Sequence, residues 1–176
     1  MNMVSKMEAI YSALNEGDTT EFERLLKAYP ECRYDDDGGD QWVTSAAMQG
    51  QLGVIELLVS FGADVAAPSD TSDASPPPEG PVFWAAAGGH YKVVEYMLDL
   101  GAPVNHDVRG QTRCFAMTSA AGRGYLEVVK LLVDRGAALN CAWANKTPLD
   151  HALECGRGEV AAYLRSVGGK TAAELT

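Results

Sequence analysis

A pattern of hydrophobic and polar positions repeats along this chain. Two apolar residues, one charged residue and three apolar or aromatic residues recur, and each copy ends in a Gly-Ala pair. The clearest copies begin at Val54, Val93 and Val128. The apolar residues recur at helical spacing, and the charged residue lies on the opposite side of the turn, so each copy predicts an amphipathic helix.

Other small residues keep a fixed offset from this pattern. With weaker copies at Glu21 and Val160, the successive steps are 33, 39, 35 and 32 residues. The matching positions are an alanine eight residues before the copy, a glycine four residues before it and a glycine eight residues after it: Ala46, Ala85, Ala120 and Ala152; Gly50, Gly89, Gly124 and Gly156; Gly62, Gly101, Gly136 and Gly168.

These positions predict a two-helix unit. Gly124 stands where a short first helix must stop and turn back, and Gly136 stands after the second helix; glycine tolerates the positive φ that such turns need. The alanines let the first helices of neighbouring units approach closely. One such unit cannot bury its apolar face alone, so stacking of units must complete the core.

A period near 33 with these signatures resembles the ankyrin repeat. The resemblance covers nearly the whole chain and implies an all-α, ankyrin-type helix-turn-helix solenoid of about five repeats with short β-hairpin fingers. We interpret residues 1–176 as a single domain. The five expected repeats are residues 7–34, 35–66, 79–105, 107–140 and 142–176. An elongated insertion loop, residues 66–80, lies between repeats 2 and 3.

Two features depart from the family pattern. The Ser-, Asp- and Pro-rich segment 66–80 contains three consecutive prolines, so it is either a tolerated surface insertion or a partner-contacting arm. Thr147-Pro148-Leu149 matches the opening of a family unit, but the histidine expected next is Asp150. The corresponding residues of the other units are Thr44, Phe83 and Thr118. These departures affect the expected inter-unit hydrogen bonds but not the stacking.

The chain is acidic, with a formal net charge of −10 and a pI of about 4.6. This charge disfavours binding to nucleic acid or to an anionic membrane, because both attract Lys and Arg. It permits attraction to a basic partner, and it also has the simpler interpretation of solubility.

The cysteines and the N-terminal residues bear on the compartment. Cys32, Cys114, Cys141 and Cys155 are scattered without a Cys-x-x-Cys motif, so we expect reduced thiols in a cytoplasmic protein. The first ten residues lack the apolar core of a signal peptide, and no apolar run is long enough to span a membrane.

Most of the side chains that could act in catalysis fall in different repeats, so the sequence does not predict an active site. His90, His106 and His151 fall in different units, and no metal-ligand spacing of Cys and His occurs. The Asp-rich segment 31–40 lacks the ligand spacing and closing Glu of a calcium loop. Asp150 and Glu154 form an i, i+4 carboxylate pair that is more typical of solvated surface. We therefore expect no cofactor, no metal and no enzymatic activity.

The resemblance implies partner binding by finger tips and by the exposed face of the first helices, which line a concave groove. Trp84 and Trp143 are the expected anchors, unless each folds over its own finger; Trp42 replaces the family's proline, and we expect it to be partly buried. Arg109, Arg113 and Arg123 give the fourth unit a positive patch. The candidate partner-binding residues are Asp35, Asp36, Asp37, Asp40, Ser45, Met48, Gln49, Glu79, Trp84, Ser119, Arg123, Trp143, Lys146, His151 and Glu154.

The functional expectation is non-catalytic binding of another protein. A pointed version is an inhibitor of a basic partner, such as an immunity protein against a bacterial toxin, because the first two fingers are acidic. The alternatives are a neutral adaptor in a signalling or regulatory complex and, from a different class, a hydrolytic enzyme that uses Asp150 or Glu154. We expect a monomer or weak self-association, and the sequence names neither partner nor organism.

Overall fold

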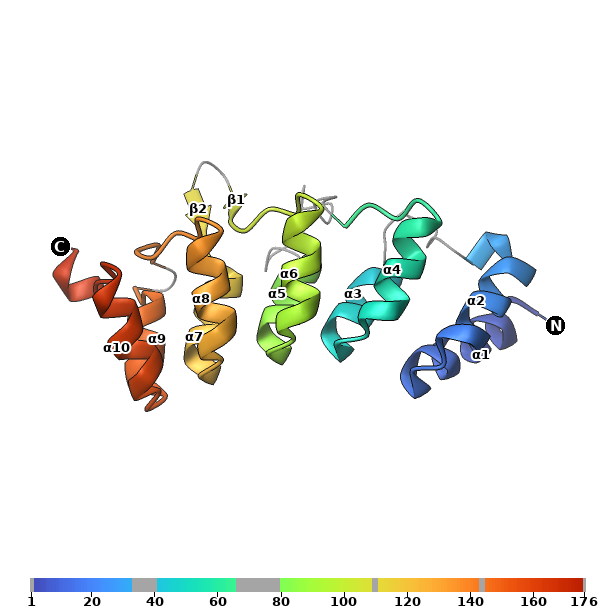
Figure 1. Ribbon diagram of the computed structural model, residues 1–176, viewed down its shortest axis with the longest axis horizontal. Coiled ribbons are helices and arrows are strands. Elements are labelled where there is room, and N and C mark those ends of the chain that lie inside the picture. The colour runs from blue at the N-terminus through green and yellow to red at the C-terminus, as the bar shows by residue number, and fades with distance from the viewer. Residues whose placement is uncertain (1, 33–40, 66–79, 109–110, 143–144, 176) are drawn as a thin grey trace.

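The chain forms a row of stacked helix pairs, with the two termini at opposite ends of the row (Figure 1). The computed structural model describes residues 2–32, 41–65, 80–108, 111–142 and 145–175. Within these ranges there are ten α-helices, which are α1 (Met3–Glu16), α2 (Thr19–Ala28), α3 (Gln41–Gln49), α4 (Leu52–Ser60), α5 (Pro81–Gly88), α6 (Tyr91–Asp99), α7 (Phe115–Arg123), α8 (Leu126–Asp134), α9 (Pro148–Glu154) and α10 (Gly158–Ser166).

The remaining regular structure is short. A 3₁₀ turn, η1 (Pro30–Cys32), follows α2, and another, η2 (Ala172–Glu174), follows α10. Strands β1 (His106–Val108) and β2 (Gln111–Arg113) pair antiparallel as one hairpin finger, with His106 opposite Arg113. The all-α solenoid is therefore confirmed, and one predicted finger is present in the described ranges. Residues 33–40 and most of the 66–80 insertion lie outside them.

The core is the layer between first and second helices of successive units. First helices α3, α5, α7 and α9 pack side by side, and second helices α6 and α8 stack in a parallel row. The predicted small residues Ala46, Ala85, Ala120 and Ala152 are all fully buried. A methyl side chain keeps the helix axes close, so the alanine positions allow the close packing that the sequence predicts.

The turn glycines have the backbone that the sequence requires. Gly124 has φ of 87° and Gly136 has φ of 81°, which confirms both predictions. A Cβ on Gly124 would also come within 2.8 Å of Cδ of Arg157 from the next unit. This position therefore needs glycine both for its φ and for the close approach of its neighbour.

At three turns, the residue after the glycine joins its unit to the preceding one. Gln51 donates from Nε2 to the Leu14 carbonyl, and Nε2 of His90 lies 3.0 Å from the Met48 carbonyl. Arg157 donates from Nε to the Gly122 carbonyl at 3.2 Å. These side chains supply inter-unit hydrogen bonds at the turns, so the units are connected although the expected family histidine is replaced.

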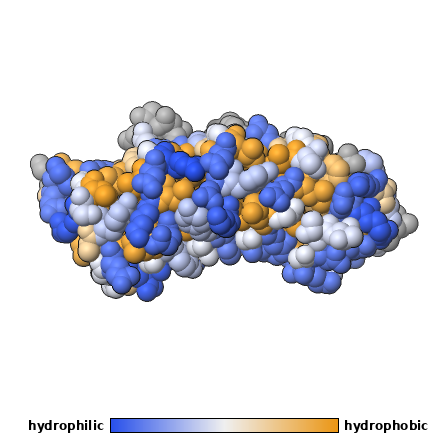
Figure 2. Space-filling view, in the orientation of Figure 1, coloured by the Kyte–Doolittle hydropathy of each residue, from blue (hydrophilic) through white to orange (hydrophobic). Residues whose placement is uncertain are grey.

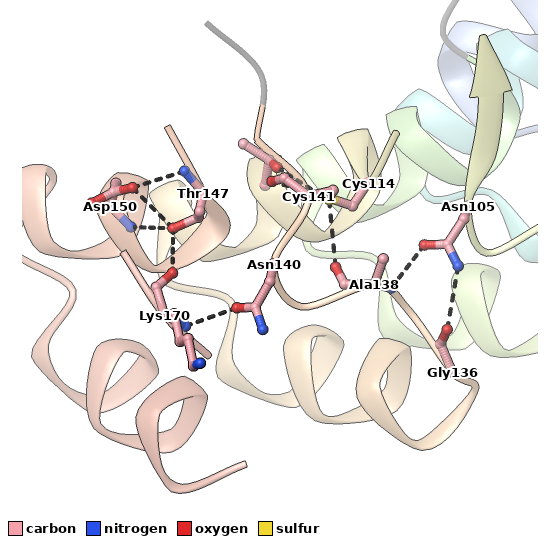
Figure 3. The surroundings of a disulfide bond; sticks show 10 residues. Asn105, Cys114, Gly136, Ala138, Asn140, Cys141, Thr147, Asp150 and Lys170 are labelled. Atoms are coloured by element: carbon pink, nitrogen blue, oxygen red, sulfur yellow. Dashed lines mark hydrogen bonds between the residues drawn. A yellow bond between two sulfur atoms is a disulfide. The ribbon is translucent and has the colours of Figure 1, made fainter. Parts of the chain in front are cut away.

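A second set of connections joins the segments that follow the second helices (Figure 3). Oδ1 of Asn105 accepts from the Ala138 amide at 2.9 Å, and its Nδ2 donates to the Gly136 carbonyl at 3.2 Å. Asn140 makes the same pair of bonds to Lys170 and Gly168, at 2.8 and 3.2 Å. Each asparagine side chain thus replaces water at two backbone groups of the next unit.

Asp150 has a structural role at the last unit. Its Oδ2 accepts from the Thr147 amide at 2.9 Å and from the Ala172 amide at 2.8 Å, and Thr147 Oγ1 donates to the Lys170 carbonyl at 2.8 Å. Burial opposes the charged form of Asp150, but these backbone hydrogen bonds outweigh it and lower the pKa of the carboxyl. Asp150 therefore fastens the C-terminal segment to α9.

Two expectations from the sequence are wrong. Trp42 is fully buried rather than partly buried, because it fills the junction between α1, α2 and α3. Cys114 and Cys141 form a disulfide rather than two free thiols, and their Cα atoms are 6.2 Å apart (Figure 3). A search for local Cys-x-x-Cys spacing could not find this pair, since stacking of the units brings together residues separated by 27 positions.

Candidate protein-binding surface

The candidate surface is the exposed side of the first helices α3, α5, α7 and α9, which we call the first-helix face. Residues at the buried side of these helices are mostly alanine, so the larger and polar side chains lie on the other side or at the helix ends. Six of the predicted binding residues lie outside the described ranges: Asp35, Asp36, Asp37, Asp40, Glu79 and Trp143. Their contribution to the surface stays a prediction.

Helix α3 presents one strongly exposed apolar side chain. Met48 is 49% exposed, whereas Ala46 and Ala47 of the same helix are fully buried. Ser45 is partly buried. Gln49 donates from Nε2 to Oδ1 of Asn15 on α1 at 3.0 Å, so its amide already connects the first two units. Met48 is therefore the predicted residue of α3 most available to a partner.

Helix α5 presents an aromatic pair. Trp84 is partly buried, and its ring meets that of Phe83 edge to face, with the centroids 5.1 Å apart and an interplanar angle of 79°. Among the residues that the structure describes, the indole N–H of Trp84 has no side-chain or backbone acceptor. A tryptophan with an unused donor suits a binding anchor, because the ring adds apolar area and the N–H adds direction.

Helix α7 contributes Ser119 and Arg123. Ser119 is partly buried, and Arg123 is exposed in the last turn of the helix. Within the described ranges Arg123 makes no ion pair. A cation near a helix C-terminus is favoured by the helix dipole, and its guanidinium remains available to an anionic group.

Around α9 the structure brings three predicted residues into one region. Lys146 and Glu154 form an ion pair with Nζ and Oε2 2.7 Å apart, and the hydrogen bond that Lys146 donates to Glu154 raises the pKa of Lys146. Both side chains are partly exposed, so this pair contributes little to stability. His151 is partly buried against α7, since a Cβ on Gly122 would lie 3.6 Å from that of His151.

His151 has an orphan ring nitrogen. Its Nε2 is shielded from water and has no hydrogen-bond partner in the part of the chain that the structure describes. The sequence predicts a groove-facing histidine here. A Cβ built on Gly122 would lie 3.6 Å from Cβ of His151 and 3.8 Å from Sγ of Cys155, so this part of α9 packs closely against α7, and a role of His151 in the groove stays a prediction.

Two features of this region were not predicted from the sequence. Phe83, treated only as a replacement for the family histidine, supports the ring of Trp84. The Cys114–Cys141 disulfide ties the start of α7 to the following finger. Neither could be found from residue type alone, because each depends on which side chains the stacking brings together.

The described residues contain no group of three or more His, Cys, Asp or Glu side chains placed to hold a metal ion. They also include no helix that is both long enough and apolar enough to cross a membrane. The first-helix face instead offers an exposed methionine, an aromatic pair and mixed charges.

Stacked helix pairs, one of them preceded by a hairpin finger, define a repeat protein of the solenoid class. A family profile described as Ankyrin repeats (3 copies) matches residues 82–173, which is more than half of the chain. The chain belongs to the ankyrin-repeat family. Members of this family are generally protein–protein interaction modules and are generally non-catalytic.

Curated relatives contain similar segments within longer proteins. Ankyrin repeat and KH domain-containing protein 1 of Homo sapiens is 34% identical over 56% of this chain and 4% of its own length. Alpha-latroinsectotoxin-Lt1a of Latrodectus tredecimguttatus is 30% identical over 70% of this chain and 8% of its own. A putative ankyrin repeat protein of Rickettsia felis is 40% identical over 42% of this chain and 31% of its own. The chain thus spans less than a third of each of these relatives.

Proposed function

We propose that this chain binds a basic protein partner through its first-helix face and inhibits it, in the manner of an immunity protein that neutralises a toxin. The observation that carries the binding surface is the presence of an exposed apolar residue, Met48, on α3 and of a partly buried tryptophan, Trp84, on the adjacent helix α5. Aromatic residues flanked by polar side chains are typical hot spots of interfaces.

The preference for a basic partner rests on charge. The chain carries a formal net charge of −10, and the acidic residues 35–37, 40 and 79 fall in the first two fingers by register. An acidic surface accelerates the encounter with a basic protein, and salt screens this effect.

The cytoplasmic location stays a proposal, and one of its supports is lost. It rested partly on four reduced thiols, and only Cys32 and Cys155 are free. Disulfides are uncommon in the cytosol of mesophiles, so the Cys114–Cys141 pair does not favour that compartment.

Partner capture from the native source tests the surface. Wild type, Trp84→Ala and Met48→Ala would be compared with Leu100→Ala, a control that removes a residue 44% exposed at the end of α6. We expect one basic protein to be captured by wild type and by the control, and to be lost with Trp84→Ala. Retention of the same partner by Trp84→Ala and Met48→Ala would exclude the first-helix face as the main contact.

An adaptor module is the second candidate, since the relatives carry similar segments within much longer chains. Salt dependence separates the two once a partner is known. An inhibitor steered by charge should associate at least about ten-fold more slowly as ionic strength rises from low to high, and it should abolish its partner's activity. An adaptor would show neither effect. Turnover that depends on Glu154 would instead support the enzyme alternative.

A further inference from the structure

A polar hollow lies between the turns of the last two units. Its volume is about 230 Å³, and it is lined by Arg123 and Gly124 from the α7–α8 turn and by residues 156–160 from the α9–α10 turn. The β1–β2 finger and these turns lie at opposite edges of the row of helices (Figure 1). The hollow is therefore separate from that finger, and Arg123 is the residue that it shares with the first-helix face.

Two arginines face this hollow in a protein that is otherwise acidic. Arg123 and Arg157 both line it, and neither makes an ion pair with a described residue. Arg157 uses Nε to hold the Gly122 carbonyl, which fixes the guanidinium over Gly124. Its terminal nitrogens have no acceptor within the described ranges, so the fork that suits an oxyanion is held in place and unused.

The backbone beside the arginines is open. A Cβ built on Gly156 or Gly158 would meet no other atom within 4 Å. The amides of Gly158 and Val160 have no backbone acceptor in the described chain, whereas the Leu126 amide in the preceding unit donates to the Gly124 carbonyl at 3.0 Å. The hollow thus adds unused backbone donors to two unused guanidinium groups.

One residue that lines the hollow carries a negative charge. Glu159 also lines the hollow, and its carboxylate would repel a bound anion. The local balance is therefore two arginines against one carboxylate, which leaves a net positive site.

We propose that this hollow binds an oxyanion group, a carboxylate or a phosphate, on the side chain of a peptide segment of a partner protein. The arginines hold the oxyanion, and the open glycine backbone admits the peptide that carries it. The hollow opens to solvent and is polar, which suits one group of a larger ligand better than an enclosed small molecule.

Nuclear magnetic resonance titration tests the site with two probes. The capped peptides Ala-Ala-Glu-Ala-Ala and Ala-Ala-phosphoserine-Ala-Ala would be added to the whole chain, and the amide signals of Gly156, Gly158 and Val160 followed. We expect saturable shifts with at least one peptide. Shifts with both assign a carboxylate as sufficient, and shifts with the second alone assign a phosphate.

Three variants separate a specific site from a general effect of charge, because each should change the peptide affinity differently. Arg123→Gln should weaken binding at least about five-fold, and Glu159→Gln should strengthen it. Arg165→Gln removes an equal charge from α10 outside the hollow, where Arg165 pairs with Glu174, and should change the affinity less than about two-fold. Circular dichroism would confirm that each variant is folded.

The proposal is overturned if neither peptide gives saturable shifts with wild type. It is also overturned if Arg123→Gln and Arg165→Gln weaken binding equally, because the effect would then be general charge. Glu159→Gln gives an independent reading should Arg123→Gln fail to fold. Arg123 belongs to both surfaces, but the capture experiment changes only Trp84 and Met48, so failure of this site would leave the test of those two residues standing.

Discussion

The indole N–H of Trp42 donates to the backbone carbonyl of Cys32 at 2.8 Å. This bond fixes the largest of the fully buried side chains that the structure describes. The ring centroid of Trp42 lies 4.6 Å from that of Tyr11 on α1 and 5.9 Å from that of Phe22 on α2. One side chain therefore joins the first helix pair to the second.

Replacing Trp42 should detach the first unit. We expect Trp42→Ala to lower the free energy of unfolding by about 3–5 kcal/mol, because it leaves a cavity and an unpaired carbonyl at the junction. Hydrogen exchange should accelerate first in α1 and α2. Trp84→Ala is the matched control and should cost about 1–2 kcal/mol, since its ring is only partly buried. Equal losses for the two variants would contradict this assignment.

The asparagine connections should stabilise the C-terminal units. Asn140→Ala removes two side-chain hydrogen bonds to the backbone, so we expect a loss of about 1–3 kcal/mol in chemical denaturation. Asn15→Ala removes one exposed side-chain bond to Gln49 and should cost less than about 0.5 kcal/mol. A loss no larger for Asn140→Ala than for Asn15→Ala would show that water replaces these bonds without cost.

Asp150 should make stability depend on acid pH. Hydrogen bonds lower the pKa of its carboxyl below the ordinary value of 3.8, so its stabilisation is complete above about pH 4. It is lost as the pH falls through the lowered pKa of the folded state. Asp150→Asn should cost about 1–3 kcal/mol at pH 7 and flatten the fall in stability below pH 4.

The control for Asp150 is Glu154→Gln on the same helix. It breaks only the exposed ion pair with Lys146 and should cost at most about 1 kcal/mol. Thermal melts between pH 2 and pH 7 would compare the two variants with wild type. An unchanged acid dependence in Asp150→Asn would show that other carboxyls control it.

The disulfide should be visible in thiol counting. Denatured, non-reduced protein should react through Cys32 and Cys155 alone, whereas four thiols would contradict the Cys114–Cys141 bond. Closing a loop of 27 residues is worth about 3–4 kcal/mol in the chain-entropy model. Reductant should therefore lower the melting temperature of wild type, while Cys114→Ser with Cys141→Ser should start lower and not respond.

The surface contains both hydrophilic and hydrophobic areas. Hydrophilic residues cover much of the face shown in Figure 2, with hydrophobic patches between them. Exposed large apolar residues include Met48 on α3 and Leu153 on α9. Single exposed apolar residues are ordinary on protein surfaces. Met48 therefore indicates a binding surface only together with Trp84 on the adjacent helix.

The repeat register, the helix pairs and the turns could all be predicted from the order of residues along the chain. Alanine at Ala120 and glycine at Gly124 and Gly136 act within a few residues of where they stand, and a local signal of this kind is written directly in the chain. The family resemblance also rests on residue spacing along the chain, as does the expectation that no metal site is present.

The tertiary structure decided which side chains meet. It buried Trp42, joined Cys114 to Cys141 and used Asp150 to fasten the C-terminal segment. It also placed Arg123 and Arg157 around one hollow, although 34 positions separate them. Contacts between stacked units depend on the rise and rotation from one unit to the next, and no spacing along the chain encodes that geometry residue by residue.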